Sequence, residues 1–414
     1  MTDSELLLWI IVAIVSIEFV LERILSYLNV KNSSPQLPPH LKEIYDEEKY
    51  RKSQAYMLAK EKLSWVSSTV LFLATTLMLL LGGFGWIDQT ISTYTNNLFW
   101  HTLLFFGIVG LAADVLNIPF EWYSIFVIEE KFGFNKMNLK TYVTDKLKGW
   151  LLSAILGGAL LSAFIWFYES FRDYFWLYAW ILFMGFSLLM MMFYTSWIVP
   201  LFNKLTPLPD GDLRKAIEDY AQKVHFPLKN IMVMDGSKRS TKANAYFSGI
   251  GSTKNIVLYD TLIEKHSVNE LVAVLAHEVG HYKKKHTLQM FLLSALTTLF
   301  TLYVLSVFVE NPLLSQALGG KNTSLALGLI AFSILYSPIS MVTGLLINVL
   351  SRKNEYEADA YAASTSSSTD LATALKKLSV DTLSNLTPHS AYVFFYYSHP
   401  PLLRRLNALF QNKN

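Results

Sequence analysis

Residues 174–199 read YFWLYAWILFMGFSLLMMMFYTSWIV and contain no charged side chain. At 1.5 Å per residue, a helix of this length is about 39 Å long and exceeds the roughly 30 Å hydrocarbon core of a bilayer. We therefore predict that it crosses a membrane. Six other runs are long and predominantly apolar, so we predict seven spans, near residues 6–28, 64–86, 99–127, 150–167, 174–199, 287–309 and 324–350.

The composition agrees with a membrane protein. Of the 414 residues, 52% are hydrophobic and only 16% are charged, whereas soluble domains contain about 25% charged residues. The chain has no cysteine, which excludes disulfides, thiolate metal ligands and a cysteine nucleophile. Its 35 basic and 32 acidic residues give a net charge of +3, too close to neutrality for a nucleic-acid-binding protein. We expect a lipid bilayer, and no nucleic acid, as its partner.

The basic residues lie on one side of the predicted spans. Segments 29–63, 128–148, 200–286 and 351–414 together carry 32 Lys and Arg, whereas the segments at the opposite ends of the spans carry 2. Cytoplasmic loops are enriched in Lys and Arg. With seven spans, this asymmetry predicts an N-terminus outside and a C-terminus in the cytoplasm.

Glu18 and Glu22 fall inside the first predicted span, and Asp114 and Glu121 fall inside the third. Charged side chains are costly in lipid, so we expect all four to face a water-filled interior or polar partners on another helix.

The sequence HEVGH at residues 277–281 carries the chemistry. Positions i and i+4 share one face of a helix, so His277 and His281 can both reach one zinc ion. Glu278 lies beside the metal but off the ligand pair. There its carboxylate can take a proton from the attacking water and pass it to a leaving amine.

A catalytic zinc requires three protein ligands and one open position. Glu355 and Asp359 follow the seventh predicted span, on the same side of the membrane as HEVGH, and share a helix face. One of them can ligate zinc, and the other can accept the free N–H of a ligand histidine. Glu357 points elsewhere on that helix, but the spacing leaves it open as an alternative ligand.

Several blocks together resemble the type 1 CAAX prenyl proteases, a family of integral-membrane zinc metalloproteases. The C-terminal half contributes HEVGH, the E-x-x-x-D pair and SHPPLLRRL at 398–406, and the N-terminal half contributes YRKSQAY at 50–56 and FVIEEKFGFN at 126–135. A further block runs from Ser240 to Phe247. The resemblance covers roughly residues 35–408.

The resemblance implies a fold and an activity. The spans would surround a large water-filled chamber, with the zinc site facing inward near the cytoplasmic side. The enzyme would remove the last three residues of a C-terminal CAAX sequence whose cysteine is prenylated. His277, His281 and Glu355 match the ligands of one zinc ion, Glu278 matches the general base, and Asp359 matches a carboxylate that holds a ligand histidine.

Three more residues match positions beside the substrate. His399 and Arg405 correspond to the family's His and Arg near the substrate and the oxyanion, where a cation stabilises developing negative charge. Asn244 corresponds to the edge strand that binds the substrate main chain by β-augmentation.

The predicted fold is mainly α, with seven transmembrane helices around a chamber and a small cytoplasmic α+β metalloprotease unit. Residues 200–286 should contain helices at 212–224 and 268–285 and strands near 230–234, 243–247 and 255–259. The expected divisions are residues 1–199 with five spans and the cytoplasmic loops 29–63 and 128–148, residues 200–286 with the HEVGH helix, residues 287–350 with spans six and seven, and residues 351–414 with helices near 354–363 and from 370.

We therefore expect a membrane zinc metalloendopeptidase that acts on a peptide or a prenylated protein. Two alternatives stay open. A protease that clears misfolded membrane proteins would share the same site, and a transporter or channel could hold a structural metal. Structural zinc sites usually have four protein ligands, so three ligands and a nearby glutamate favour the enzyme. We expect a bacterial member in the inner membrane, with its active site cytoplasmic, rather than a protein of the endoplasmic reticulum.

Overall fold

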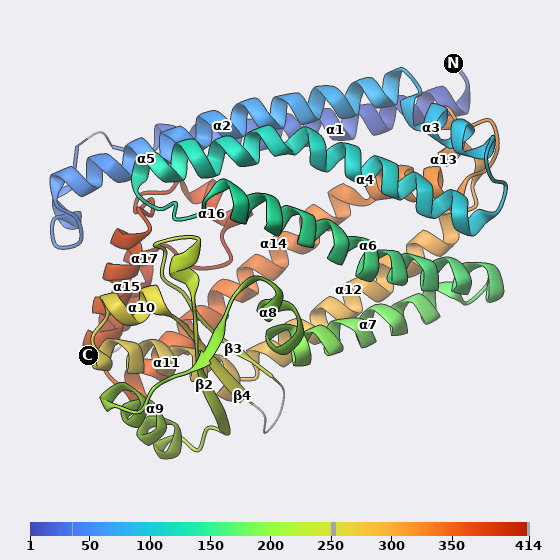
Figure 1. Cartoon of the computed structure of the whole chain (residues 1–414). Coiled ribbons are helices and arrows are strands. Elements are labelled where there is room, and N and C mark those ends of the chain that lie inside the picture. Colours follow the sequence, from blue (N-terminus) through green and yellow to red (C-terminus); the bar gives the residue numbers. More distant parts are fainter. Residues whose placement is uncertain (35, 250–253, 412–414) are drawn as a thin grey trace.

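The computed structural model describes residues 1–34, 36–249 and 254–411 (Figure 1). Within these residues, seven helices are long and apolar enough to cross a membrane, as predicted. They are α1 (Asp3–Lys31), α2 (Glu47–Leu80), α4 (Leu98–Tyr123), α6 (Leu139–Ser170), α7 (Phe175–Phe193), α12 (His286–Phe308) and α14 (Leu325–Thr365). Two of them continue through a π-helical turn: α4 through Ser124–Glu129 into α5 (Glu130–Phe132), and α7 through Tyr194–Ile198 into α8 (Val199–Phe202).

The seven helices form a closed ring. Each packs against the next in the order α1, α2, α4, α6, α7, α12 and α14, and α14 packs against α1. α4 also contacts α14 across the ring. The ring of seven helices agrees with the predicted fold, and the chamber stays an expectation from the sequence resemblance.

Two clusters of buried hydrophobic side chains join the spans. The first lies at the end of the ring beside the N-terminus (Figure 1). There α3 (Gly83–Ser92) and α13 (Pro312–Ala317) close the ring, and Phe105 of α4 meets Leu327 of α14. Six of the spans bury only 6% to 17% of their most apolar stretch, whereas α14 buries 39%. α14 is therefore the span most enclosed by protein.

The two acidic residues of the third span contact a lysine on the neighbouring helix. Lys146 on α6 lies 2.9 Å from Asp114 Oδ1 and 2.8 Å from Glu121 Oε2. The neighbouring helix thus supplies a cation to both carboxylates, which is the second of the two environments expected for them.

The second predicted span ends earlier than expected. α2 stops at Leu80, and Gly82 adopts a left-handed φ of +65° before α3 begins. Gly85 then donates its N–H to Leu318 O at 2.9 Å, and a Cβ on Gly85 would lie 2.3 Å from the backbone of Gly319. The apolar sequence continues to residue 86, but this close backbone contact turns the chain out of the span.

A four-stranded sheet lies at the opposite end of the ring. Its order is β1 (Leu205–Pro207), β2 (Leu228–Met234), β4 (Lys254–Tyr259) and β3 (Ala245–Ser248). β2 and β4 are parallel, the other pairs are antiparallel, and β3 is an edge strand. The three predicted strands are confirmed within two residues. β1 was not predicted, because three residues that include a proline give no alternating pattern.

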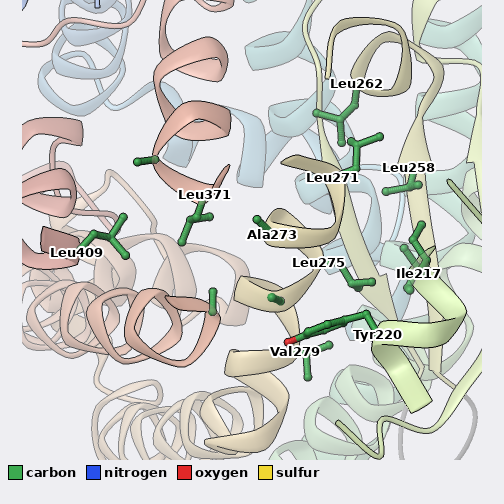
Figure 2. Packing of buried hydrophobic residues seen from close by; sticks show 14 of the residues in the cluster. Ile217, Tyr220, Leu258, Leu262, Leu271, Ala273, Leu275, Val279, Leu371 and Leu409 are labelled. Carbon is green, nitrogen blue, oxygen red and sulfur yellow. The ribbon is translucent and has the colours of Figure 1, made fainter. Parts of the chain in front are cut away.

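Helix α11 (Val268–Lys283) lies at the centre of the catalytic end. Its apolar residues Leu271, Ala273, Leu275 and Val279 are buried between α9 (Asp212–Lys223) and the sheet on one side and α15 (Ser368–Asp381) and α17 (Leu402–Gln411) on the other (Figure 2). The short helices α10 (Asp260–Lys265) and α16 (Ser390–Tyr396) and the single turns Pro39–Leu41 and Gly236–Lys238 complete this end. The core holds the HEVGH residues on a fixed helix.

Two helix boundaries differ from the prediction. The helix expected near 354–363 is the end of α14, which runs without a break from Leu325 to Thr365 across the division placed at residues 350 and 351. Hydropathy detects only the apolar part of such a helix. The helix expected over 268–285 ends at Lys283, because Lys285 has a φ of +59° and α12 starts at His286.

The N-terminus of α11 gives a stability prediction. Glu270 accepts the N–H of Ser267 at 3.0 Å in a capping box and binds Lys377 of α15 at 2.8 Å. Glu270→Ala should lower the free energy of unfolding by about 1–2 kcal/mol. Thermal unfolding in detergent measures this loss, with the exposed Glu264→Ala as control.

The loss of unfolding free energy in Glu270→Ala should depend on pH. Burial opposes ionisation of Glu270, but the bond to Lys377 outweighs it and lowers the pKa of Glu270. A depressed pKa stabilises the fold above the ordinary glutamate value, and this contribution disappears as the pH falls through the lowered pKa. The difference in unfolding free energy between wild type and Glu270→Ala should therefore become smaller in acid. An equal difference at neutral and acidic pH would contradict a stabilising ion pair between Glu270 and Lys377.

Candidate metal centre

The site forms where α11 crosses α14. At the crossing, Gly280 faces Ala358, and a Cβ on Gly280 would lie 3.0 Å from the Ala358 backbone. The helices can approach this closely only because residue 280 has no side chain. Gly280 directly precedes His281, and Ala358 lies between Glu355 and Asp359 in the sequence. The contact therefore brings the two predicted motifs face to face.

Three donor groups converge at this crossing. One ligand atom from each of His277, His281 and Glu355 lies within 4.8 Å of the others. The Nε2 atoms of the two histidines are 3.2 Å apart, and the Glu355 oxygens lie 3.3 Å from His281 Nε2 and 3.5 Å from His277 Nε2. Tetrahedral zinc with bonds of 2.0–2.1 Å has ligand atoms about 3.3 Å apart. The three groups thus have the spacing of ligands around one ion.

Glu355 supports the same interpretation. Its side chain is buried, and its Oε2 atom has no hydrogen-bond partner. Arg405 Nη1 lies 3.3 Å from this oxygen but makes no hydrogen bond to it, so a closely bound cation would still stabilise the buried carboxylate. Glu357, the alternative ligand, is half-exposed and points to His286, with 3.3 Å between Oε2 and Nε2. The geometry therefore favours Glu355 as the third donor.

Asp359 holds the first histidine. Its Oδ1 lies 2.9 Å from His277 Nδ1, so the other ring nitrogen faces the donor cluster. The Arg405 guanidinium donates to both Asp359 oxygens at 2.8 Å and 2.6 Å, and its third nitrogen lies 3.3 Å from Glu355 Oε2. The structure therefore brings Asp359 and Arg405 together at the site, and Arg405 fixes Asp359 by a bidentate bond.

His286 holds the second histidine, and the sequence did not reveal it. His281 Nδ1 lies 3.0 Å from His286 Nδ1, and His286 in turn contacts Glu357. If His281 binds a metal through Nε2, its Nδ1–H donates to His286, whose Nε2–H then donates to Glu357. His286 lies beyond the helix break at Lys285, so helical spacing from HEVGH could not place it.

The electrostatics of the cluster favour a cation. Burial works against a charged His277, but its bonds to Asp359 and Glu355 outweigh burial and raise the pKa of His277 to about 9. The same carboxylates that stabilise a proton here would stabilise a divalent metal.

A cavity of about 520 Å³ opens onto the three donors. Glu278, His399, Arg405 and Asn244 all line it, so the structure gathers every predicted site residue except the buried Asp359 around one space. Its remaining walls are mainly apolar, with Leu262, Val274, Leu371, Leu375 and Leu378. A second cavity of about 300 Å³ shares Glu278 and His281 with the first. The donors thus lie between two cavities.

Two predicted residues face the open side. His399 has an exposed side chain, and its Nε2 lies 3.3 Å from Glu355 Oε1. Asn244 is exposed immediately before the edge strand β3. An edge strand presents unpaired N–H and C=O groups to which an extended peptide can bind.

Comparison with known families covers nearly the whole chain. Residues 26–204 match the family described as CAAX prenyl protease N-terminal, five membrane helices, and residues 207–413 match Peptidase family M48. Similar proteins include a CAAX prenyl protease 1 homolog of Arabidopsis thaliana, 37% identical over 91% of this chain and 90% of the relative. CAAX prenyl protease 1 of Saccharomyces cerevisiae is 35% identical over 95% of this chain and 92% of the relative.

The fold has a solved counterpart. The crystal structure of S. mikatae Ste24p superposes with a TM-score of 0.93 and 33% sequence identity, over 99% of this chain and 100% of that one. The similarity includes both the ring of spans and the catalytic end.

The donor set predicts how metal binding responds to mutation. His281→Ala and Glu355→Ala should each lose the bound ion, and Asp359→Ala should weaken binding by about 10–100-fold, because His277 loses the group that orients it. Glu357→Ala should keep a full complement of metal. Metal per chain after dialysis against a graded chelator measures this order. If Glu357→Ala lost the metal while Glu355→Ala kept it, the donor assignment would be wrong.

Proposed function

The chain belongs to peptidase family M48, within the CAAX prenyl protease 1 group, and is a membrane metalloendopeptidase; on this premise we propose that it removes the last three residues of prenylated CAAX proteins and uses zinc. The observation that carries the proposal is the juxtaposition of His277, His281 and Glu355, with Glu278 beside them, on the floor of a cavity with an apolar wall. Aliphatic side chains of a CAAX tail fit such a wall.

We propose His277, His281 and Glu355 as the zinc ligands. A zinc ion held there polarises a peptide carbonyl and lowers the pKa of water. Glu278 lies one residue from His277 and lines both cavities. Its carboxylate takes the proton of the attacking water and delivers it to the departing amine. Asp359 and His286 keep the two histidines oriented while the substrate binds.

The substrate is held by groups on opposite walls of the larger cavity. On one side, Asn244 and the edge strand β3 bind the extended main chain. On the other side, His399 donates to the negative charge that develops on the carbonyl oxygen, and the Arg405 charge lies behind it. Arg405 also bonds Asp359, so it contributes to two parts of the site.

A transporter with a structural metal is disfavoured. Among the residues that the structure describes, the site has three donors, one fewer than a closed structural zinc site. The family is also a peptidase family. A comparison of substrates distinguishes CAAX processing from protein quality control by the same site.

The proposal is tested with a farnesylated CAAX peptide, the same peptide without the lipid, and an unfolded membrane segment. We expect the highest kcat/KM for the farnesylated peptide, with release of a tripeptide. Glu278→Gln should abolish hydrolysis but retain the metal, because the ligands survive and the base is lost. A higher kcat/KM for the unfolded segment would support quality control instead. Cleavage by Glu278→Gln at a rate near that of wild type would show that Glu278 is not the general base.

We also propose that the catalytic end lies in the cytoplasm. The two termini lie at opposite ends of the molecule (Figure 1), and the catalytic end contains segments 200–286 and 351–414, which carry most of the Lys and Arg. The named relatives are eukaryotic, and the assignment to a bacterial inner membrane stays a prediction from the sequence.

Orientation is testable because the native chain has no cysteine. Asn96→Cys is exposed at the end with α3, and Lys215→Cys is exposed on α9. An impermeant thiol reagent should label Asn96→Cys in intact cells and Lys215→Cys only after permeabilisation. The reverse pattern would place the site outside and remove the cytoplasmic CAAX substrate.

A further inference from the structure

An ion-pair cluster lies outside the metal site, where three distant segments meet. Lys242 Nζ lies 2.8 Å from Glu129 Oε2 and donates to Tyr56 OH at 2.9 Å. Tyr56 donates its hydroxyl proton to Glu129 Oε1 at 2.5 Å. The segments are α2, the π-helical turn after α4, and the loop before β3. They are also the blocks at 50–56, 126–135 and 240–247 that the sequence analysis singled out, and the metal chemistry uses only the last of them.

Aromatic rings enclose the ammonium group. Lys242 Nζ lies 4.5 Å from the centroid of the Phe134 ring and 5.3 Å from that of Tyr56. Tyr56 packs edge-on against both Phe132 and Phe134, with centroids 5.1 Å apart in each case. The Glu129 side chain is 15% exposed and that of Lys242 is 32% exposed. A second cation, Lys60 Nζ, lies 3.6 Å from Glu129 Oε1. A charge pair shielded in this way is stronger than one in open water.

The π-helical turn Ser124–Glu129 belongs to this arrangement. One extra residue in a helical turn rotates the following side chains by about 100° relative to a regular α-helix. Glu129 is the last residue of the turn and faces Lys242. π-turns are frequent at functional positions, and here the turn sets the direction of the carboxylate.

The cluster is joined to one wall of the larger cavity through the backbone. Lys242 is followed by Ala243 and Asn244, which both line the cavity and lead into β3. Thr241 donates its N–H to Phe134 O at 3.0 Å, and Lys242 O accepts the hydroxyl proton of Thr261 at 3.0 Å. The approach to the edge strand is thus fixed between the spans and α10.

The cluster also reaches another part of the cavity wall. Leu383 is buried with Tyr56, Phe132 and Phe134, and its neighbours Thr382 and Ser384 line the cavity. Leu383 has a left-handed φ of +52°, so packing against the rings maintains a backbone conformation that is unfavourable for leucine. One cluster therefore supports two parts of the cavity wall.

We propose that Lys242, held by Glu129 and Tyr56, is a positioning residue that fixes the edge strand and the cavity width for the peptide substrate. The inference rests on the proposed function for its kinetic part. Lys242 is not among the metal donors, so its loss should weaken substrate binding more than it affects the chemistry.

Lys242→Met tests this inference, because it keeps the aliphatic stem but removes the charge. We expect KM for the cleaved peptide to rise about tenfold, with kcat within about twofold and metal content unchanged. Lys242→Arg should keep most of the affinity for the peptide, because arginine can still donate to Glu129 Oε2 and to the Tyr56 hydroxyl oxygen. Combining Lys242→Met with Glu129→Gln should raise KM no further than the stronger single change. Lys238→Met, exposed four residues earlier, is the matched control.

A second measurement needs no activity. Amide hydrogen exchange of residues 239–249 should be faster in Lys242→Met than in wild type and in Lys238→Met, while that of α11 stays the same. Wild type without activity on every peptide would contradict the proposed function but leave this readout intact. Unchanged exchange, or loss of metal together with a lower unfolding temperature in both Lys242→Met and Lys242→Arg, would overturn the positioning role.

Discussion

The contact between Gly280 on α11 and Ala358 on α14 sets the distance between the two helices that carry the proposed metal donors. With a Cβ at residue 280 only 3.0 Å from the Ala358 backbone, any side chain there would push the helices apart. Donor atoms 3.2 to 3.5 Å apart tolerate little such movement. The glycine of HEVGH is thus a packing requirement of the metal site, separate from the chemistry of the two histidines.

The helix on the other side of that contact also belongs to the membrane ring. α14 runs unbroken from the closed end of the ring to the site, and it is the most buried of the spans. Glu355 is therefore held by a helix whose other half is fixed among α1, α4 and α12. A carboxylate on such a helix loses little conformational freedom on binding metal, which favours binding. The membrane ring thus supports a rigid carboxylate at the site.

The sequence was sufficient for features that depend on a short repeating pattern. Long, predominantly apolar runs located the seven spans, and helical spacing in HEVGH and between Glu355 and Asp359 predicted the candidate site. It was insufficient where distant segments determine the structure. His286 reaches His281 across a helix break, and Lys242 meets Glu129 because of a π-turn that has no periodic signal. The end of α2 depends on the contact between Gly85 and Gly319, which lie far apart in the sequence.

The charges at the candidate site fit a divalent cation. Glu278, Glu355 and Asp359 supply three negative charges, and Arg405 supplies one positive charge, which leaves a formal surplus of two negative charges. A divalent cation neutralises that surplus, and two neutral histidines complete its donor set without adding charge. The position of the Arg405 charge matters as much as the net charge of the site. Arg405 binds Asp359 through two hydrogen bonds, whereas Glu355 Oε2 has none. The protein thus binds the carboxylate beside His277 through two hydrogen bonds, whereas Arg405 contacts the carboxylate that faces the proposed donors only by an ion pair at 3.3 Å.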